Sequence, residues 1–291
     1  MTGRVVLVAT PIGNLADLSP RAVETLAEAD VICCEDTRHT RKLLSAAGIR
    51  GAHLLAVHAH NEATMAARVV ARAQAGEVVA LVSDAGLPGV SDPGQRVVRA
   101  AVDAGVAVGI VPGPSAALAA LVVSGLDADR FCFEGFLPRQ GGPRRARLAA
   151  LAAEERTMVI YESPHHLVRT LEDLVGVLGP KRAVALAREL TKIHEEVWRG
   201  SLHDAVGRVA GGEQRGEWVL VVAGAVPDAV GDAEIRAALA VRLERNGDAK
   251  AAVAAVTAEL GVARRRVYAQ GLALRQSRGE AGRTLPEPVK E

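Results

Sequence analysis

The stretch from Val79 to Ala116 reads VALVSDAGLPGVSDPGQRVVRAAVDAGVAVGIVPGPSA, and it decides the expected fold. Two apolar runs, 78–82 and 106–111, have the length and the β-branched composition of strands. Between them, residues 95–104 place Val97, Ala101 and other apolar side chains on one stripe of a helix. A strand, a helix and a second strand in this order predict a parallel sheet in an α/β fold.

Both predicted strands end in unusual loops, Ser-Asp-Ala-Gly-Leu-Pro-Gly at 83–89 and Pro-Gly-Pro-Ser-Ala at 112–116. In open α/β sheets, ligands bind beyond the carboxyl ends of the strands. The acid Asp84 and the hydroxyl Ser115 therefore mark a first candidate site. The glycines of these loops either only shape turns or let the backbone approach a ligand closely. Because several strands end in such loops, we favour the second interpretation.

Composition sets broad limits on the function. A chain of 291 residues is long enough for two domains and a small third one. Apolar residues make up 49% and charged residues 24%, which is ordinary for a globular protein, while 2% aromatic residues predict a core of Val, Leu and Ala. A net charge of +1 argues against a protein that coats nucleic acid and permits only a local basic patch.

Cysteine and histidine usage predicts neither disulfides nor a metal. The three cysteines have no disulfide or zinc-site spacing, so we expect small buried residues in a reducing compartment. His58 and His60 have no further ligand at a convincing spacing. A strand-like segment begins at residue 4 and no apolar run reaches the roughly 18 residues that span a membrane, so we expect a cytoplasmic protein without a leader.

The remaining pattern divides the chain into four parts. Further strands are expected at 4–8, 31–34 and 54–57, and helices begin at the Ser19-Pro20 pair and at Glu62. Later come a buried apolar helix at 115–124, a helix capped by Ser163, strands at 131–133, 157–161 and 182–188, and a closing antiparallel pair, 195–200 with 217–222. The expected parts are an N-terminal α/β domain (1–113), a second α/β domain (114–226), a helix-turn-helix-like module (232–275) after a linker at 226–231, and a disordered tail (276–291).

Two dense polar clusters follow predicted strands. The first, Glu35-Asp36-Thr37-Arg38-His39-Thr40-Arg41, is either a solvated helix start capped by a threonine or part of a site. The second runs from Arg188 to Glu196. Since both lie just past strand ends, both are candidate site segments.

The segment 139–147 carries four arginines and two glycines with no nearby acid. It is either a solvated hairpin or helix start, or a mobile flap that contacts phosphates, and we favour the flap. Three further arginines, 264–266, open the last helix of the predicted helix-turn-helix-like module.

Common nucleotide and hydrolase motifs are missing. The sequence has no GxGxxG after its first strand, no GxxxxGK[ST] and no GxSxG. Its polar loops contain acids, hydroxyls, arginines and a lysine, which suit the binding of a charged organic cofactor and the orientation of a group transfer.

Seven motifs carry a family resemblance: VATPIGNL, CEDTRHTRKLL, LVSDAGLPGVSDPG, VPGPSA, YESPHH, ARELTKIHEE and GEWVLVV, in this order. Together they resemble the tetrapyrrole-methylase superfamily of S-adenosylmethionine (SAM) enzymes, and within it the branch that acts on small-subunit ribosomal RNA. The match covers nearly the whole chain, including the C-terminal helices. It departs from the family at His165-His166, where one His followed by Arg is usual, and at Cys33-Cys34.

The resemblance implies two α/β domains with SAM in the cleft between them, and a homodimer. It implies transfer of the methyl group to the ribose 2′-hydroxyl of a decoding-centre cytidine, position 1402, of 16S rRNA in the small ribosomal subunit. By motif position, the implied cofactor-binding residues are Pro11, Ile12, Asp84, Gly86, Leu87, Ser115, Ala116, Tyr161 and Glu189.

A ribose hydroxyl is a poor nucleophile and needs a base or a nearby cation. The candidates for these catalytic roles are Glu35, Asp36, Arg38, Glu189 and Lys192, with the cluster at 35–38 preferred first and Lys192 second. The expected RNA-binding residues are Arg139, Arg144, Arg145, Arg147, Arg264, Arg265 and Arg266.

Two other functions stay open at this point. One is a methylase of a tetrapyrrole-type small molecule or of a protein residue, which would need neither the basic segment nor the C-terminal module. The other is a non-catalytic nucleic-acid-binding regulator, against which the near-neutral charge and the intact polar loops argue.

Overall fold

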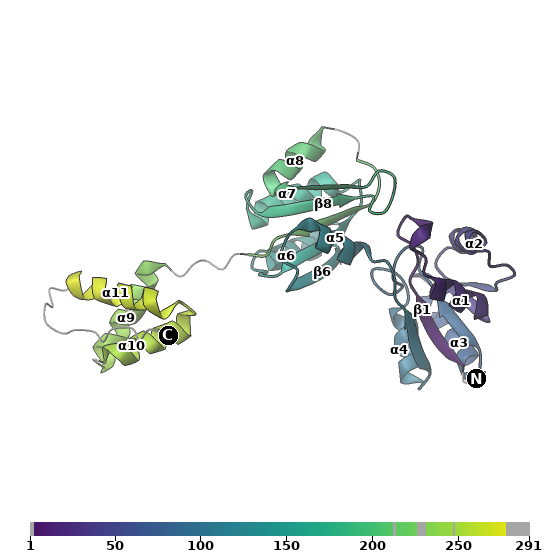
Figure 1. The fold of residues 1–291 in the computed structure, drawn as a ribbon, viewed down its shortest axis with the longest axis horizontal. Coiled ribbons are helices and arrows are strands. Elements are labelled where there is room, and N and C mark those ends of the chain that lie inside the picture. Colours follow the sequence, from purple (N-terminus) through teal and green to yellow (C-terminus); the bar gives the residue numbers. More distant parts are fainter. Residues whose placement is uncertain (1–2, 212–213, 226–230, 247, 278–291) are drawn as a thin grey trace. The chain divides into compact units, whose positions relative to one another are not determined.

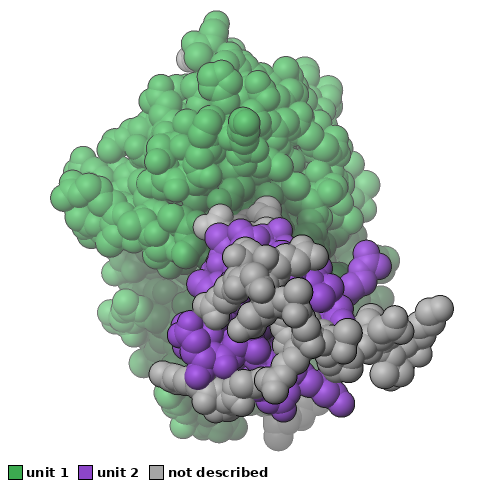
Figure 2. All heavy atoms as spheres, turned by 90° about the vertical axis from the view of Figure 1, so that its left-hand side faces the viewer, with its two compact units in different colours: residues 1–225 green, residues 226–291 purple. Residues whose placement is uncertain are grey.

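The computed structural model describes residues 3–211, 214–225, 231–246 and 248–277 (Figure 1). It forms two compact units, residues 1–225 and 226–291, coloured separately in Figure 2. Most of the predicted linker (226–230) and most of the predicted tail (278–291) lie outside the described residues.

The first sheet is parallel and confirms the expected α/β class. Its strand order is β3-β2-β4-β1-β5, with β1 between β4 and β5. Parallel order places the carboxyl ends of neighbouring strands at one edge, where their loops meet. The strands are β1 (Arg4–Val8), β2 (Val31–Cys34), β3 (Leu54–Ala56), β4 (Val78–Leu81) and β5 (Ala107–Val111).

Helices cover both faces of this sheet, as its continuous apolar strands require. Successive residues of a strand point to opposite faces, so Val5 packs on one side and Val6 on the other. Helices α3 (Glu62–Gln74) and α4 (Gln95–Asp103) cover the face of Val5, while α1 (Pro20–Glu28) and α2 (Thr37–Ala46) cover the face of Val6. Ser19 caps α1 with Pro20 at its first turn, as predicted.

The second sheet is mixed, and one sequence prediction about it is wrong. Its order is β6-β7-β10-β8-β9, so β9 and β10 do not pair with each other. Every residue of β10 is buried and this strand lies between β7 and β8, while the half-exposed β9 takes the edge. The strands are β6 (Phe131–Phe136), β7 (Thr157–Glu162), β8 (Ala183–Arg188), β9 (Glu196–Ser201) and β10 (Trp218–Val222).

Helices α6 (Gly141–Leu151), α7 (Leu167–Leu178) and α8 (Leu202–Ala210) pack on one face of the second sheet. Helix α8, which the sequence analysis did not predict, begins with a capping box of Ser201 and Asp204. Ser163 does not cap α7: His166 holds the N-cap position and makes no side-chain capping bond. The predicted boundary at residue 113 falls between β5 and α5, and its role as a domain limit stays a prediction.

Helix α5 (Ala116–Ser124) packs on the other face of the second sheet, but only partly as expected. Ala120 and Leu121 are buried, whereas Leu118 and Val122 are 51% and 74% exposed. The expectation of a buried helix is therefore wrong for one side. A helix that is apolar all round gives no sequence signal of which side faces the core.

The second unit is a bundle of three helices, α9 (Asp232–Asn246), α10 (Ala249–Leu260) and α11 (Arg264–Ser277). Its core includes Ile235, Leu239 and Val256. Asp248 caps α10 and Gly261 ends it in the left-handed conformation, which confirms the turn signals in the sequence. Helix α11 continues to residue 277, so the first two residues of the predicted tail are helical. Within the described residues, no helix is both long and apolar enough to cross a membrane.

Candidate active site

The loops that follow β1 and β4 are fastened to each other at the carboxyl edge of the first sheet. The amide of Thr10 donates to the carbonyl oxygen of Gly86 at 2.9 Å, and the amide of Gly86 donates back to Thr10 at 3.1 Å. The Thr10 hydroxyl is buried and donates to the carbonyl of Ser83 at 3.2 Å. Gly86 has φ +79°, a conformation that glycine adopts without strain.

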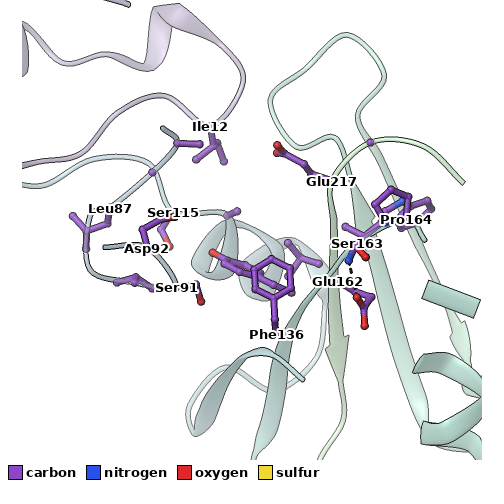
Figure 3. A pocket seen from close by; sticks show the side chains of 18 residues that line it. Ile12, Leu87, Ser91, Asp92, Ser115, Phe136, Glu162, Ser163, Pro164 and Glu217 are labelled. Atoms are coloured by element: carbon purple, nitrogen blue, oxygen red, sulfur yellow. Dashed lines mark hydrogen bonds between the residues drawn. The ribbon is translucent and has the colours of Figure 1, made fainter. Parts of the chain in front are cut away.

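A cavity of about 330 Å³ lies against these loops and the second sheet, and we call it the first cavity (Figure 3). Its volume lies in the range of small-molecule sites. Among the described residues that line it, none is Lys, Arg or His, and the charged side chains are all carboxylates. The lining residues are Ile12, Ala85, Gly86, Leu87, Val90, Ser91, Asp92, Ser115, Ala116, Phe136, Tyr161, Glu162, Ser163, Pro164, Gly216, Glu217, Trp218 and Val219.

Tyr161 is held as a neutral phenol in this cavity. Its oxygen accepts a hydrogen bond from the amide of Ala117, in the first turn of α5, at 3.2 Å. Its ring packs edge-to-face against Phe133 and Phe136, with centroids 5.0 and 5.6 Å away. Burial raises the pKa of Tyr161 above its usual value, so the phenol keeps its proton at neutral pH.

A buried chain of charged groups supports the wall formed by Glu162 and Ser163. Glu162 accepts a 2.5 Å hydrogen bond from the Thr170 hydroxyl and a 2.7 Å bond from the Ser163 amide. Arg144, only 4% exposed, donates to Thr170 at 2.9 Å and to Asp173 at 2.7 Å. Each charge is therefore paired or hydrogen-bonded, as burial requires.

Asp92 lines the opposite wall, and among the residues that the structure describes no hydrogen bond or ion pair holds its carboxylate. Burial, together with the nearby charges of Glu35 and Asp84, raises the pKa of Asp92 to about 6. Burial and the charge of Asp84 also raise the pKa of Glu35, against a smaller lowering by His58. These acids therefore form a like-charged group beside the first cavity.

A second cavity of about 270 Å³ adjoins the first, and the two share Ile12, Ala85 and Glu217. Unlike the first cavity, it is lined by basic side chains from α2 and from the loop after β8. The lining residues are Thr10, Pro11, Ile12, Gly13, Leu15, His39, Lys42, Leu43, Asp84, Ala85, Lys192 and Glu217.

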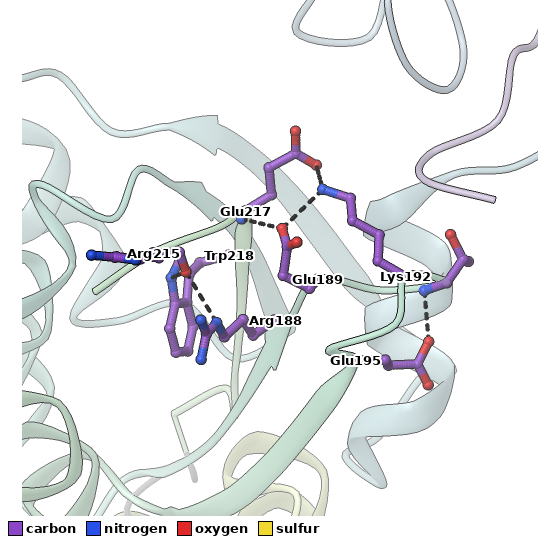
Figure 4. A network of polar contacts seen from close by, with 8 residues as sticks. Arg188, Glu189, Lys192, Glu195, Arg215, Glu217 and Trp218 are labelled. Atoms are coloured by element: carbon purple, nitrogen blue, oxygen red, sulfur yellow. Dashed lines mark hydrogen bonds and ion pairs between the residues drawn. The ribbon is translucent and has the colours of Figure 1, made fainter. Parts of the chain in front are cut away.

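Lys192 is fixed between two carboxylates beside both cavities (Figure 4). Its ammonium group donates to Glu189 at 2.8 Å and to Glu217 at 3.1 Å. Burial alone would lower the pKa of Lys192, but these two hydrogen bonds outweigh burial and raise it. Hydrogen bonding to Lys192 lowers the pKa of Glu189. Lys192 is therefore a permanent cation and cannot serve as a base at neutral pH.

The backbone around Lys192 is strained and crowded. Glu189 and Thr191 have φ of 51° and 67°, which non-glycine residues rarely adopt. A Cβ on Gly13 would lie 2.4 Å from Cγ of Lys192, and a Cβ on Gly216 would lie 2.6 Å from Cγ of Glu189. Glycine at both positions lets the neighbouring loops close on this lysine and its carboxylate partner.

The structure brings most of the expected cofactor residues together. Ile12, Gly86, Leu87, Ser115, Ala116 and Tyr161 line the first cavity, and Pro11 and Asp84 line the second. Glu189 lines neither cavity, but its side chain accepts a hydrogen bond from the Glu217 amide at 2.9 Å. Their role in binding a cofactor stays a prediction.

The expected catalytic residues fall into different positions. Asp36 caps α2 by accepting a hydrogen bond from the Arg38 amide at 2.7 Å, which lowers the pKa of Asp36. The predicted cap at Thr37 or Thr40 is therefore wrong. Arg38 has a side chain 85% exposed, at the same helix start. Glu35 keeps a raised pKa beside Asp84, which suits a proton acceptor better than the capping carboxylate does.

The prediction that the arginines at 139–147 have no acid nearby is wrong. Arg144 is buried against Asp173, and Arg147 pairs with the buried carboxylate of Glu134. The segment is not a mobile flap but leads into helix α6. Arg139 and Arg145 are exposed and keep their predicted role. Sequence reasoning missed these pairs because their acids are distant along the chain.

Sequence reasoning also missed four residues that line the cavities: Asp92, Phe136, Trp218 and Lys42. Asp92 lies in the motif LVSDAGLPGVSDPG and Lys42 in the motif CEDTRHTRKLL, directly after the first polar cluster, so both had a local signal. Phe136 and Trp218 lie on the strands β6 and β10, and no local sequence signal indicated that they line a cavity. Arg188 stacks over Trp218 at 5.5 Å, and both donate to the carbonyl of Arg215, which fixes the loop that leads to Glu217.

Comparisons with known proteins point to one family. The family description "Tetrapyrrole (Corrin/Porphyrin) Methylases" matches residues 4–206. A protein of Mycobacterium tuberculosis named ribosomal RNA small subunit methyltransferase I is 47% identical over 97% of this chain and 98% of its own length. A protein of the same name from Synechocystis sp. is 50% identical over 78% of this chain and 81% of its own length. Among solved structures, the methyltransferase CobJ has a TM-score of 0.59 at 26% identity, covering 79% of this chain and 97% of its own.

Proposed function

This chain belongs to the tetrapyrrole methylase family, and on that premise we propose that it transfers a methyl group from SAM to small-subunit ribosomal RNA. We further propose that the acceptor is the ribose 2′-hydroxyl of a decoding-centre cytidine, position 1402 of 16S rRNA. The observation that carries the proposal is the first cavity, where six residues chosen from motif positions gather around one volume.

The apolar and acidic lining of the first cavity supports SAM as its ligand. Ile12, Leu87 and Phe136 offer apolar contacts, and Asp92, Glu162 and Glu217 offer negative charge. A ligand with an ammonium group and a sulfonium group suits carboxylates that have no basic residue beside them in the lining. When bound, SAM supplies an electrophilic methyl group on its positively charged sulfur.

Methyl transfer is an in-line displacement in which alignment supplies much of the acceleration. The ribose oxygen forms a bond to the methyl carbon as the bond between carbon and sulfur breaks, and sulfur keeps the electron pair of that bond. The hydroxyl proton must leave at the same time. We propose Glu35 as its acceptor, because the pKa of Glu35 is raised and it lies beside Asp84, which lines the second cavity. Lys192 remains charged there and favours a developing negative oxygen.

The RNA-binding proposal now rests on fewer arginines. Arg139, just before helix α6, and Arg145, within that helix, are exposed. Arg264 and Arg265 are exposed at the start of α11. Arg266 pairs with Asp232 and is half exposed. We expect the exposed arginines to contact phosphates, with binding that weakens as salt increases.

The family also suggests a homodimer, and an apolar surface supports that proposal. Leu118 and Val122 of α5 and Val108 and Ile110 of β5 are exposed. Strand β5 is an edge of the first sheet. Exposed apolar side chains of this kind mark surfaces that another protein covers.

The decisive experiment is transfer of tritiated methyl from SAM to 30S subunits that lack the modification, followed by mapping of the labelled nucleotide. Label in one 2′-O-methylated cytidine is the expected result. Label elsewhere in the RNA would contradict the proposed acceptor. No label, with SAM binding intact by calorimetry, would contradict the rRNA substrate and favour a small-molecule or protein acceptor.

A further inference from the structure

We propose that the second cavity is the subsite for the acceptor nucleotide, and that Lys42 contacts its phosphate. This inference rests on the proposed function, because it assigns the acceptor of the same reaction. It concerns a different cavity from the one assigned to SAM, and a lysine to which neither the motifs nor the comparisons give a role.

The contrast in charge between the cavities is the first argument. The charged side chains that line the first cavity are all carboxylates, whereas His39, Lys42 and Lys192 line the second cavity together with the carboxylates of Asp84 and Glu217. Of the two cavities, the second is therefore the one that offers cationic groups to an anionic ligand. Nucleotides bring phosphates, and lysine binds phosphate as a point charge.

The second argument is that the cavities adjoin. Ile12, Ala85 and Glu217 line both of them. Ligands in the two cavities would therefore meet across these three residues, as a direct displacement requires. A substrate bound elsewhere on the surface would leave the methyl group out of reach.

Lys42 is the cation of this cavity that remains available. Lys192 is already held by Glu189 and Glu217, which leaves it little freedom to follow a ligand. Lys42 is exposed, and no ion pair joins it to a carboxylate within the described part of the chain. A phosphate would therefore gain a partner without breaking an existing ion pair.

The size of the second cavity limits what enters it. About 270 Å³ is too small for a double helix, and a single nucleotide is the unit of RNA that such a volume suits. The acceptor would therefore have to be unstacked from its neighbours, as enzymes that modify nucleotides commonly require. Unpaired or easily unstacked RNA should then be preferred over duplex RNA.

The first test compares Lys42→Ala with Arg41→Ala. Both residues are exposed cations on α2, but Arg41 does not line the cavity. With 30S subunits lacking the modification, Lys42→Ala should weaken binding about three- to tenfold at ~0.1 M salt and reduce the salt slope by about 1. Arg41→Ala should match the wild-type protein, and calorimetry should give unchanged SAM affinity for both variants.

The second test fills the cavity without changing a charge. Leu15 lines the second cavity and its exposed neighbour Ala16 does not. Leu15→Trp should lower kcat/KM for 30S subunits at least tenfold and leave SAM affinity unchanged, while Ala16→Trp should behave as wild type.

Equal effects of the two α2 variants on 30S binding, or full activity of Leu15→Trp, would overturn the subsite. Loss of SAM affinity in Leu15→Trp would also overturn it, because the two cavities would then be one site. These outcomes differ from failure of the proposed function, in which the wild-type protein itself leaves 30S subunits unlabelled.

Discussion

The first and second cavities share three residues and differ in charge. The first has carboxylates from both sheets, and the second has basic groups from α2 and from the loop after β8. Within the first cavity, Glu162 is fully bonded to its surroundings, whereas Asp92 faces other acids. The comparison teaches that a carboxylate beside a ligand site can have two roles. It can stabilise the wall of the site through hydrogen bonds, or it can present a negative charge to a ligand and thereby lower the stability of the free protein.

The largest expected effect tests the supported wall of the first cavity. Arg144→Ala removes the partner of Asp173 and Thr170 and leaves the buried Glu162 network incomplete. Breaking a buried charged network in this way costs about 3–5 kcal/mol of the free energy of unfolding. Urea unfolding should show this loss, while the exposed neighbour Arg145→Ala should stay within about 0.5 kcal/mol of wild type. Equal stability of the two variants would mean that the network contributes nothing.

A smaller effect tests the lysine between the cavities. Lys192→Met removes the ammonium group from Glu189 and should cost about 1–2 kcal/mol at pH 7, with Lys181→Met as an exposed control. Since Lys192 lowers the pKa of Glu189, this stability is present above about pH 4.5 and is lost as pH falls through the lowered pKa. Unfolding curves at several pH values should therefore converge for the two proteins in acid. A difference that grows in acid would refute this assignment.

The smallest expected effect concerns Asp92, on the other wall of the first cavity. Its contribution makes stability fall with rising pH, opposite to the pH dependence expected for the pair of Lys192 and Glu189. Because the pKa of Asp92 is about 6 in the folded protein, the folded state binds more protons than the unfolded state between about pH 4 and 6. Stability therefore falls as pH rises through that window. Asp92→Asn should be about 1 kcal/mol more stable than wild type at pH 7.5, allowing for solvent screening, and no more stable near pH 4.

The exposed variant Asp17→Asn provides the control for Asp92→Asn, with an expected change below about 0.5 kcal/mol at either pH. If Asp92→Asn destabilises the protein at pH 7.5, Asp92 is a structural acid like Glu162, and the contrast between the two walls fails.

Local patterns predicted much of the fold because their physical causes are local. The helix start at Glu62 and the bounds of the strands at 4–8 and 31–34 match their predictions, since apolar periodicity and turn residues act within a few residues. Local sequence patterns gave wrong predictions where an element packs against segments that are distant along the chain. The position of β10 between β7 and β8, and the exposed side of α5, depend on which surfaces the rest of the chain covers.

The residues of the candidate site also fall into those that local sequence patterns predicted and those that only the structure revealed. Loop sequences alone indicated Asp84, Gly86 and Ser115, because strand ends and glycine-rich loops can be recognised from the amino-acid sequence. No local pattern indicated that Arg144 is buried, since its partner Asp173 is 29 residues away along the chain. The same holds for Trp218, which enters the first cavity from a strand.

By itself, the sequence determined the α/β class, the strand-end loops, the family resemblance and six of the residues that line the first cavity. Only the tertiary structure decided which charges are paired, which arginines are buried, and that a cavity with carboxylates alone adjoins one with added basic side chains at Ile12, Ala85 and Glu217. The physical reason is that backbone conformation responds to near neighbours, whereas burial and electrostatics depend on groups that folding brings together from distant parts of the chain.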